Sequence, residues 1–171
     1  MPLNDLEDQM LEHVRNMIQR GLVYIYADMS KRNITSGTPP APPELKLVIG
    51  ETTTTGHYPA VRISMPTPYE TAWLATGVRN DRYTVNVDVD MRSSKKETKN
   101  KAIQGISNAI KNWMLHRPNL SGTVFQTQVG YYNSWCEATT LGSKGDGSIR
   151  TARFSWWAMV ANSYYYAGAE A

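Results

Sequence analysis

Two aspartates at alternate positions are the residues of this sequence whose types and spacing most clearly suggest chemistry. Asp88 and Asp90 lie where polar and apolar residues alternate, so a strand would place both carboxylates on one face, about 6.6 Å apart. Two such carboxylates can hold Mg²⁺ for phosphodiester chemistry. A nuclease would also need a Glu/Lys pair that converges on them, and Glu97 and Glu137 are scattered in the sequence. We therefore favour a polar sheet face, either solvated or between subunits, over a metal site.

The other chemical motifs are weaker. No GxxxxGK motif is present, and the glycine-rich residues 142–147 lie between two predicted strands, where a flexible hairpin tip is the better interpretation. His13, His57 and His116 are isolated and fit no metal-ligand spacing. Cys136 is the only cysteine, so we expect a small half-buried residue and no intrachain disulfide. We expect no catalytic residue, no metal and no cofactor.

The strand that would carry the aspartates leads into a long helix. Apolar residues alternate with polar ones over residues 83–91, which predicts a strand with one apolar face. Ser94 and Glu97 form a capping-box pattern, and Pro118 ends the helix that follows. The apolar residues between them recur at helical spacing: Ala102, Ile103, Ile106, Ala109, Ile110, Trp113 and Met114. Strand and helix each carry an apolar surface, so we expect them to pack together at the centre of the fold.

The first third of the chain combines a helix, an arm and short strands. An amphipathic helix is predicted at residues 4–20, with Gly21 as its C-terminal cap, and a short strand at residues 22–26. Closely spaced prolines make residues 30–44 an extended arm. Residues 45–49 are either a strand or a continuation of the arm.

The remaining segments complete an α+β fold. Strands are predicted at residues 58–65, 124–132 and 149–162, one helical turn at 71–75, turns at 80–81 and 119–122, and loops at 52–56 and 134–148. We expect residues 1–162 to form a single domain. Its mostly antiparallel sheet would carry two amphipathic helices and end in a C-terminal hairpin with the long loop 134–148. Residues 163–171 would form a tail.

Neighbouring aromatic residues raise the question of a second covered face. Trp156 and Trp157 would point to opposite sides of a strand, so only one of them enters the core. The hairpin would then carry large apolar groups on both faces, which indicates either a sheet covered on both sides or an oligomer interface. We expect the subunit or partner interface to include Trp135, Glu137, Arg150, Arg153 and Trp157.

Charge and composition narrow the class of protein further. The chain has 171 residues, 41% of them hydrophobic, and a net charge of +3, which permits nucleic-acid contact without arguing for it. Lysines crowd the start of the long helix at positions 95, 96, 99 and 101; they indicate a solvated face or contact with an acidic partner or a phosphate backbone. No apolar run approaches the roughly 20 residues of a membrane helix. No signal-peptide profile is present, so we expect synthesis in the cytosol and no membrane partner.

This order of elements resembles the tail terminator proteins of long-tailed bacteriophages, also called tail-completion or tail-to-head joining proteins. The resemblance covers most of the chain and lies in four places. They are the helix at residues 4–20 with its proline-bearing arm, the strand at 58–63, the strand at 82–89 that runs into the long helix, and the closing hairpin strand at 153–160.

The resemblance implies a structural virion protein that is not an enzyme. Such proteins form a hexameric ring that caps the tail tube and offers a surface to the head connector or stopper protein. The implied partners are further copies of the chain, the tail tube protein and the connector, while DNA only passes through the ring. The implied location is the neck of the virion, after assembly in the host cytoplasm. Asp88 and Asp90 could then line the channel and repel DNA phosphates.

Three alternatives stay open. Another ring-forming tail protein, such as the tube protein, is the first, although tube proteins usually have more strand and less helix than this sequence indicates. A nucleic-acid-binding α+β module would use the lysine-rich helix start. A Mg²⁺-dependent nuclease would use the two aspartates.

Overall fold

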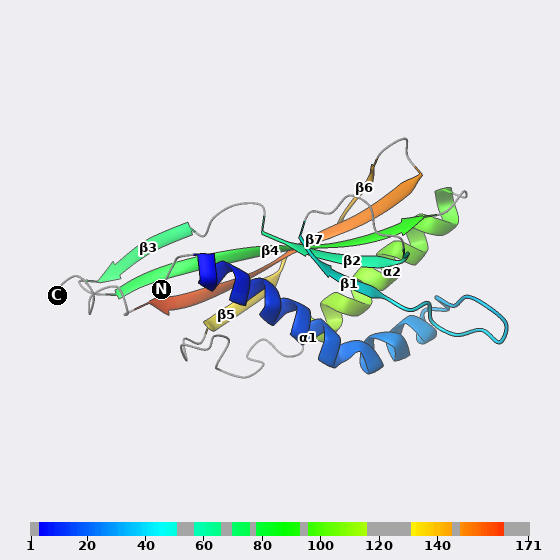
Figure 1. The fold of residues 1–171 in the computed structure, drawn as a ribbon, viewed down its shortest axis with the longest axis horizontal. Coiled ribbons are helices and arrows are strands. Elements are labelled where there is room, and N and C mark those ends of the chain that lie inside the picture. Colours follow the sequence, from blue (N-terminus) through cyan, green and yellow to red (C-terminus); the bar gives the residue numbers. More distant parts are fainter. Residues whose placement is uncertain are drawn as a thin grey trace.

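The computed structural model describes residues 4–50, 57–65, 70–75, 78–92, 96–115, 131–144 and 148–162. In chain order their elements are α1 (Asn4–Lys31), β1 (Lys46–Ile49), β2 (Ala60–Ser64), β3 (Glu70–Ala75), β4 (Val78–Arg92), α2 (Lys96–Leu115), β5 (Tyr131–Cys136), β6 (Thr140–Lys144) and β7 (Ile149–Asn162) (Figure 1). The fold is α+β, with both helices packed on a mostly antiparallel sheet, which confirms the predicted fold class. Neither of these two helices has the length and hydrophobicity needed to cross a membrane.

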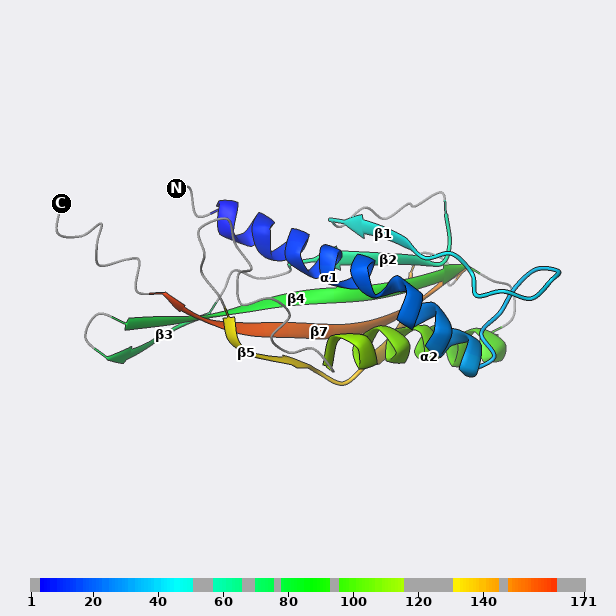
Figure 2. The ribbon, with the colours of Figure 1, turned by 90° about the horizontal axis from the view of Figure 1, so that it is seen from below.

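The sheet is built around two long antiparallel strands, β4 and β7. Their pairing extends from Arg79 opposite Asn162 to Arg92 opposite Ile149, along the length of the molecule (Figure 2). Each outer edge of this pair takes two shorter strands in succession: β2 and β3 lie along β4, and β5 and β6 lie along β7. β1 adds to β2 in a parallel pairing.

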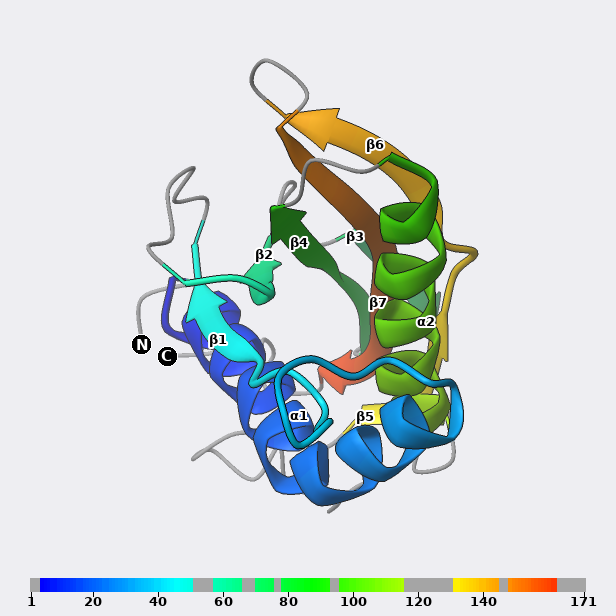
Figure 3. The ribbon, with the colours of Figure 1, turned by 90° about the vertical axis from the view of Figure 1, so that its right-hand side faces the viewer.

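One face of the central strands forms the apolar core with the helices. On β4 the core side chains are at most 1% exposed: Tyr83, Val85, Val87 and Val89. They share the core with Ile103, Ile106, Ile110 and Met114 of α2 and with Ala152, Phe154 and Trp156 of β7. The predicted packing of the alternating strand against the long helix is therefore confirmed. Seen along the long axis, the second half of α1 lies beside α2, and the sheet curves past both helices (Figure 3).

The first helix is longer than predicted, and residues 22–26 are helical rather than a strand. The apolar stripe continues beyond Gly21 through the fully buried Ile25, so extending the helix keeps that side chain in the core. Gly21 faces the ring of Trp113, whose Nε1 donates a hydrogen bond to the carbonyl oxygen of Met17 at 2.8 Å. A β-carbon at position 21 would overlap that ring. The glycine therefore permits the close approach of α2 and does not end α1.

The predicted helical turn at residues 71–75 and the predicted turn at 80–81 both lie in strands. β3 pairs with the first part of β4, so that Glu70 lies opposite Arg82. The alternation of apolar residues begins only at Tyr83, which is why the sequence pattern missed this extension of β4. Pairing with β3 on one side and β7 on the other, rather than a periodic apolar face, accounts for the strand here.

The loop predicted at residues 134–148 contains the end of β5 and all of β6. The pairing of β5 with β7 ends at Trp156, so the first part of β7 would have unpaired backbone groups along that edge. β6 pairs with residues 149–153 and fills this edge. The closing hairpin is therefore formed by β6 and β7, and Gly142 lies within β6 rather than at a flexible tip.

The remaining predictions fall into two groups. β7 has the predicted bounds, and β1 and β2 lie within the predicted segments 45–49 and 58–65. The arm begins only after Lys31, and it contains one isolated bridge between Ser36 and Ala41. Several predictions lie outside the described residues: Ser94 of the capping box, the loop at 52–56, His116, the turn at 119–122, the first part of the strand at 124–132 and the tail at 163–171.

Candidate interface on the sheet face away from the helices

Strand register gathers polar side chains into rows on this face of the sheet. Asp88 on β4 lies opposite Arg62 on β2 and, on its other side, opposite Arg153 on β7. In the next row Asp90 lies opposite Thr151. Because side chains along a strand alternate, these residues emerge opposite the valines that pack against the helices. Acidic and basic groups that are distant in the sequence thus become neighbours.

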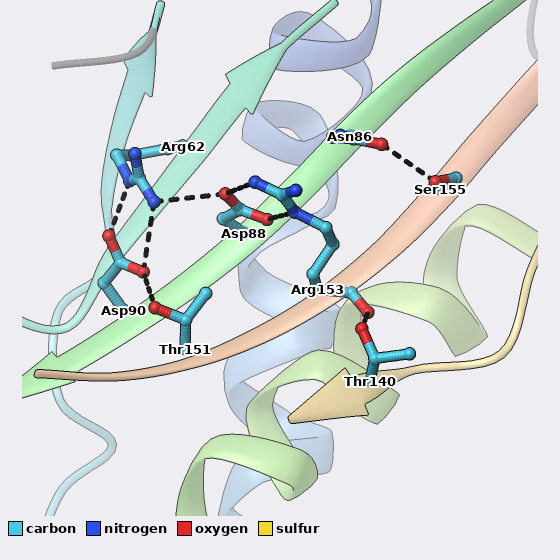
Figure 4. Close-up of polar contacts among 8 residues, drawn as sticks. All are labelled: Arg62, Asn86, Asp88, Asp90, Thr140, Thr151, Arg153 and Ser155. Atoms are coloured by element: carbon cyan, nitrogen blue, oxygen red, sulfur yellow. Dashed lines mark hydrogen bonds and ion pairs between the residues drawn. The ribbon is translucent and has the colours of Figure 1, made fainter. Parts of the chain in front are cut away.

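Asp88 accepts hydrogen bonds from two arginines (Figure 4). Arg153 donates from Nε to Oδ1 at 2.6 Å and from Nη2 to Oδ2 at 2.8 Å, a bidentate geometry. Arg62 donates from Nη2 to Oδ2 at 3.1 Å. The side chain of Asp88 is only 2% exposed, whereas that of Arg153 is 47% exposed. Arg153 therefore reaches from the surface to a buried carboxylate.

Asp90 is held by a buried arginine and a hydroxyl. Arg62 donates from Nε to Oδ2 at 2.5 Å, and Thr151 donates from Oγ1 to Oδ1 at 2.7 Å. Arg62 thus joins both aspartates, and its own side chain is 6% exposed. Two carboxylates and two guanidinium groups balance in charge, which is the condition under which buried ions are tolerated. We call Arg62, Asp88, Asp90, Thr151 and Arg153 the ion-pair cluster.

The ion-pair cluster is poorly suited to the Mg²⁺ chemistry considered for the two aspartates. Their oxygens accept hydrogen bonds from Arg62, Arg153 and Thr151. A metal ion would have to displace these donors and leave the guanidinium of Arg62 buried without a carboxylate, which is energetically costly. In the part of the chain that the structure describes, no three His, Cys, Asp or Glu side chains gather in a way that could hold a metal ion.

The proposed channel-lining role of Asp88 and Asp90 stays a prediction. Both side chains are almost fully buried within the single chain and are paired with arginines. The subunit therefore offers little of their negative charge to anything that passes its surface. Repulsion of DNA by these two carboxylates would require a rearrangement of the ion-pair cluster on assembly.

Two tryptophans lie side by side on the same face. Trp135 of β5 is directly opposite Trp157 of β7, and Trp135 is 53% exposed. The indole Nε1 of Trp157 donates a hydrogen bond to Oε1 of Glu137 at 2.9 Å. The guanidinium carbon of Arg82 lies 5.3 Å from the centre of the Trp157 ring, in cation–π range. We call Arg82, Trp135, Glu137 and Trp157 the tryptophan patch.

The structure brings together four of the five residues predicted for an interface. Trp135, Glu137 and Trp157 belong to the tryptophan patch, and Arg153 lies on the same face of β7. Arg150 is different, because its position in the alternation puts it on the helix side of the sheet. Its Nε donates a hydrogen bond to Oδ1 of Asn100 on α2 at 3.0 Å. Arg150 therefore ties a strand to a helix within the chain.

Sequence patterns did not single out Arg62, Thr151 or Arg82. Arg62 does alternate with Val61 and Ile63 in the predicted strand, which was a usable sign that it faces away from the core. Its partners depend on which strands pair and in which register, and periodicity within one strand does not contain that information. Thr151 and Arg82 were missed for the same reason.

Burial shifts two titratable groups on the core side of the sheet. His13 lies near Trp156, with 6.2 Å between ring centres; burial, aided by the charge of Arg20, lowers its pKa to about 4. Burial raises the pKa of the Cys136 thiol to about 12, although Lys111 acts in the other direction. Cys136 is 4% exposed, more deeply buried than predicted. A thiol with these properties is not a nucleophile at neutral pH.

The chain has no matching sequence family and a weak similarity to a solved structure. No protein-family model and no curated protein sequence matches the chain. Among solved structures, the chain is similar to one chain of a structure described as the virion of a native gene transfer agent (GTA) particle, with 12% sequence identity and a TM-score of 0.42. The match covers 67% of this chain and 78% of that chain. A likeness at this level carries no conclusion about function.

Proposed function

We propose that the protein is a structural component of a phage-like virion, a tail terminator that forms a ring on the end of the tail tube. The tryptophan patch is the observation that carries this proposal. Tryptophan and arginine are the residue types that dominate the binding energy of protein interfaces. An indole that is 53% exposed on a strand of the sheet is well placed to bury itself against another protein.

The patch has the rigidity that an interface anchor needs. Strand pairing with β7 fixes the backbone of Trp135. The ring of Trp157 is held by the hydrogen bond from its Nε1 to Glu137 and by Arg82 over its face. The Trp157 side chain therefore has little conformational entropy left to lose on binding, which favours affinity. Arg153, half-exposed on the same face, adds a charged group that a partner can contact.

Two further observations support a structural role over catalysis. The order of helix, arm, long strand, long helix and closing hairpin agrees with the order on which the resemblance to tail terminators rests. The pair of carboxylates that suggested a nuclease is buried and bound to arginines. In this proposal the partners are further copies of the chain, the tail tube protein and the head connector or stopper protein. A heterologous contact between identical subunits closes into a ring when its rotation permits.

The proposal is tested by a pair of alanine variants. Trp135→Ala should weaken assembly by about 30-fold, because loss of a central aromatic anchor typically costs 2 kcal/mol or more. Val23→Ala is the matched control, since Val23 is 77% exposed on α1, away from the patch. Size-exclusion chromatography with light scattering, over a concentration series, measures both. Equal assembly of Trp135→Ala and the wild type would contradict the proposal.

The same protein preparations separate the alternatives. Salt-sensitive binding to duplex DNA would favour a nucleic-acid-binding module, because phosphate contacts release counterions. Mg²⁺-dependent cleavage of DNA that is lost in Asp88→Asn would favour a nuclease. A tube protein would extend into long tubes instead of stopping at a ring, and negative-stain images distinguish these outcomes directly.

A further inference from the structure

A pocket of about 820 Å³ lies where the arm meets the end of β4 and the first turns of α2. Its size falls within the range of ligand-binding pockets in proteins. Residues from four separate segments line it, including Arg32 and Ile34 of the arm, Tyr58 before β2, Arg92 at the end of β4 and Lys101 of α2. Neither the ion-pair cluster nor the tryptophan patch contributes to it.

The lining of this pocket is positively charged. Arg32, Arg92 and Lys101 are all exposed, and no aspartate or glutamate is among the described residues that line the pocket. Arg32 shares part of its charge with Asp28, at 3.1 Å. Lys101 follows two other lysines of α2, Lys96 and Lys99, in the sequence. The pocket therefore attracts anions.

The rest of the lining favours an acidic peptide over a phosphate group. Ile34, Pro43, Tyr58, Pro59 and Met91 supply apolar and aromatic surface between the cations. A phosphate would use only the cations and would leave this surface exposed to water. A peptide that carries both carboxylates and apolar side chains uses the two kinds of surface together, as specific ligand sites usually do.

The chain itself contains a segment of that composition. Residues 4–14 carry four carboxylates (Asp5, Glu7, Asp8 and Glu12), together with leucine and methionine side chains, and no lysine or arginine. This segment forms the first turns of α1. Met10 is fully buried in the core of its own copy, whereas Asp8 and Glu12 are exposed and Leu11 is partly buried. In Figures 1 and 2 the start of α1 lies toward one end of the molecule. The arm and the start of α2 lie toward the other end. Within one copy the segment and the pocket thus lie apart, so a contact between them requires a second copy.

We propose that this pocket receives the acidic first turns of α1 from a second copy of the chain. The contact is heterologous, since one copy contributes the acidic segment and the other contributes the basic pocket. It specifies one contact between neighbours in the proposed ring and therefore rests on the proposed function. Opposite charges at the two surfaces also favour one relative orientation of the copies, because like ends repel.

A charge-swap experiment tests the contact in the full chain. Arg92→Glu/Lys101→Glu and Glu7→Lys/Asp8→Lys should each weaken self-association at least about tenfold, measured by light scattering. An equimolar mixture of the two variants should restore association, because each altered surface then meets a complementary one. Lys46→Glu, an exposed charge reversal on β1 outside the pocket, is the matched control and should have no effect. Association of either double variant alone at wild-type strength would overturn the proposal, and so would a mixture that fails to associate.

A binding assay keeps the test decisive if a variant assembles poorly for another reason. Labelled Arg92→Glu/Lys101→Glu protein, which keeps the acidic segment, should bind Glu7→Lys/Asp8→Lys protein, which keeps the basic pocket, at least about tenfold more tightly than it binds itself. Failure of these two variants to bind each other would overturn the pocket assignment even if the wild-type protein forms rings. Displacement by inorganic phosphate at equal concentration would overturn it in favour of a phosphate site.

Discussion

Arg153 holds Asp88 through two hydrogen bonds, at 2.6 and 2.8 Å, although the arginine is half-exposed and the carboxylate is buried. Asp88 also accepts a bond from Arg62, so the buried acid has one partner from inside the sheet and one from the surface. The two arginines are not equivalent, because Arg62 is buried and also donates a hydrogen bond to Asp90. The charge balance of the whole face depends on this arrangement.

Removal of Arg62 should therefore lower stability more than removal of Arg153. Arg62→Ala removes the buried arginine from both Asp88 and Asp90 and should lower the free energy of unfolding by roughly 3–5 kcal/mol, the usual effect of breaking a buried pair. Arg153→Ala leaves Arg62 beside Asp88 and should lower the free energy of unfolding by about 1.5–3 kcal/mol. Urea denaturation of the two variants measures both values. A larger loss for Arg153→Ala than for Arg62→Ala would show that the surface arginine, not the buried one, holds the cluster.

Gly21 should reverse the usual preference for alanine in a helix. An alanine normally stabilises a helix interior by about 1 kcal/mol relative to glycine. At position 21 the added β-carbon would overlap the ring of Trp113, so Gly21→Ala should destabilise the protein by about 1–3 kcal/mol. Gly142→Ala in β6 is the control, because nothing lies within 4 Å of its added carbon. Thermal denaturation compares the two, and a Gly21→Ala protein as stable as the wild type would mean that α2 does not pack this closely on α1.

His13 should make stability depend on pH in a defined window. Its pKa is about 4 when folded and 6.5 when unfolded, so between these values the unfolded chain binds a proton that the folded chain does not. The stabilisation is complete above pH 6.5 and is lost as the pH falls toward 4, up to about 3 kcal/mol. Because carboxylates titrate in the same range, the measurement is the difference between wild type and His13→Gln in urea denaturation at pH 7 and pH 4.5. Identical pH dependence of the two proteins would remove His13 as the cause.

Cys136 should be chemically silent in the folded protein. A thiol pKa of about 12 leaves almost no thiolate at pH 8, and the side chain is 4% exposed. A disulfide reagent added at pH 8 should react with the native protein at least about 100-fold more slowly than with protein in denaturant. The absorbance of the released thiol follows the reaction. Comparable rates in the two states would show that β5 opens readily from the sheet.

The parts of the fold that could be predicted are those with a periodic apolar pattern. Val85, Val87 and Val89 alternate, and Ile103, Ile106 and Ile110 repeat at helical spacing, so each pattern specified both an element and its buried face. β7 was predicted with its observed bounds for the same reason. These segments pack through one apolar face, and one-dimensional periodicity is enough to find such a face.

The parts that could not be predicted depend on partners distant in the sequence. Gly21 was interpreted as a helix end, and only the position of Trp113 shows that it permits close packing. β6 was interpreted as a loop, because its pairing with β7 fills a sheet edge and does not create an apolar face of its own. Asp88 and Asp90 were recognised as a pair on one face, but their arginine partners follow from strand register.

The most direct test of the central proposal is the native mass of the protein, alone and after addition of purified tail tubes. A ring-forming tail terminator predicts particles of six times the 19.2 kDa chain mass, either free or bound at tube ends, with tubes that no longer lengthen. Trp135→Ala protein should remain small under the same conditions. A wild-type protein that stays a monomer at all concentrations and leaves tube growth unchanged would contradict the account.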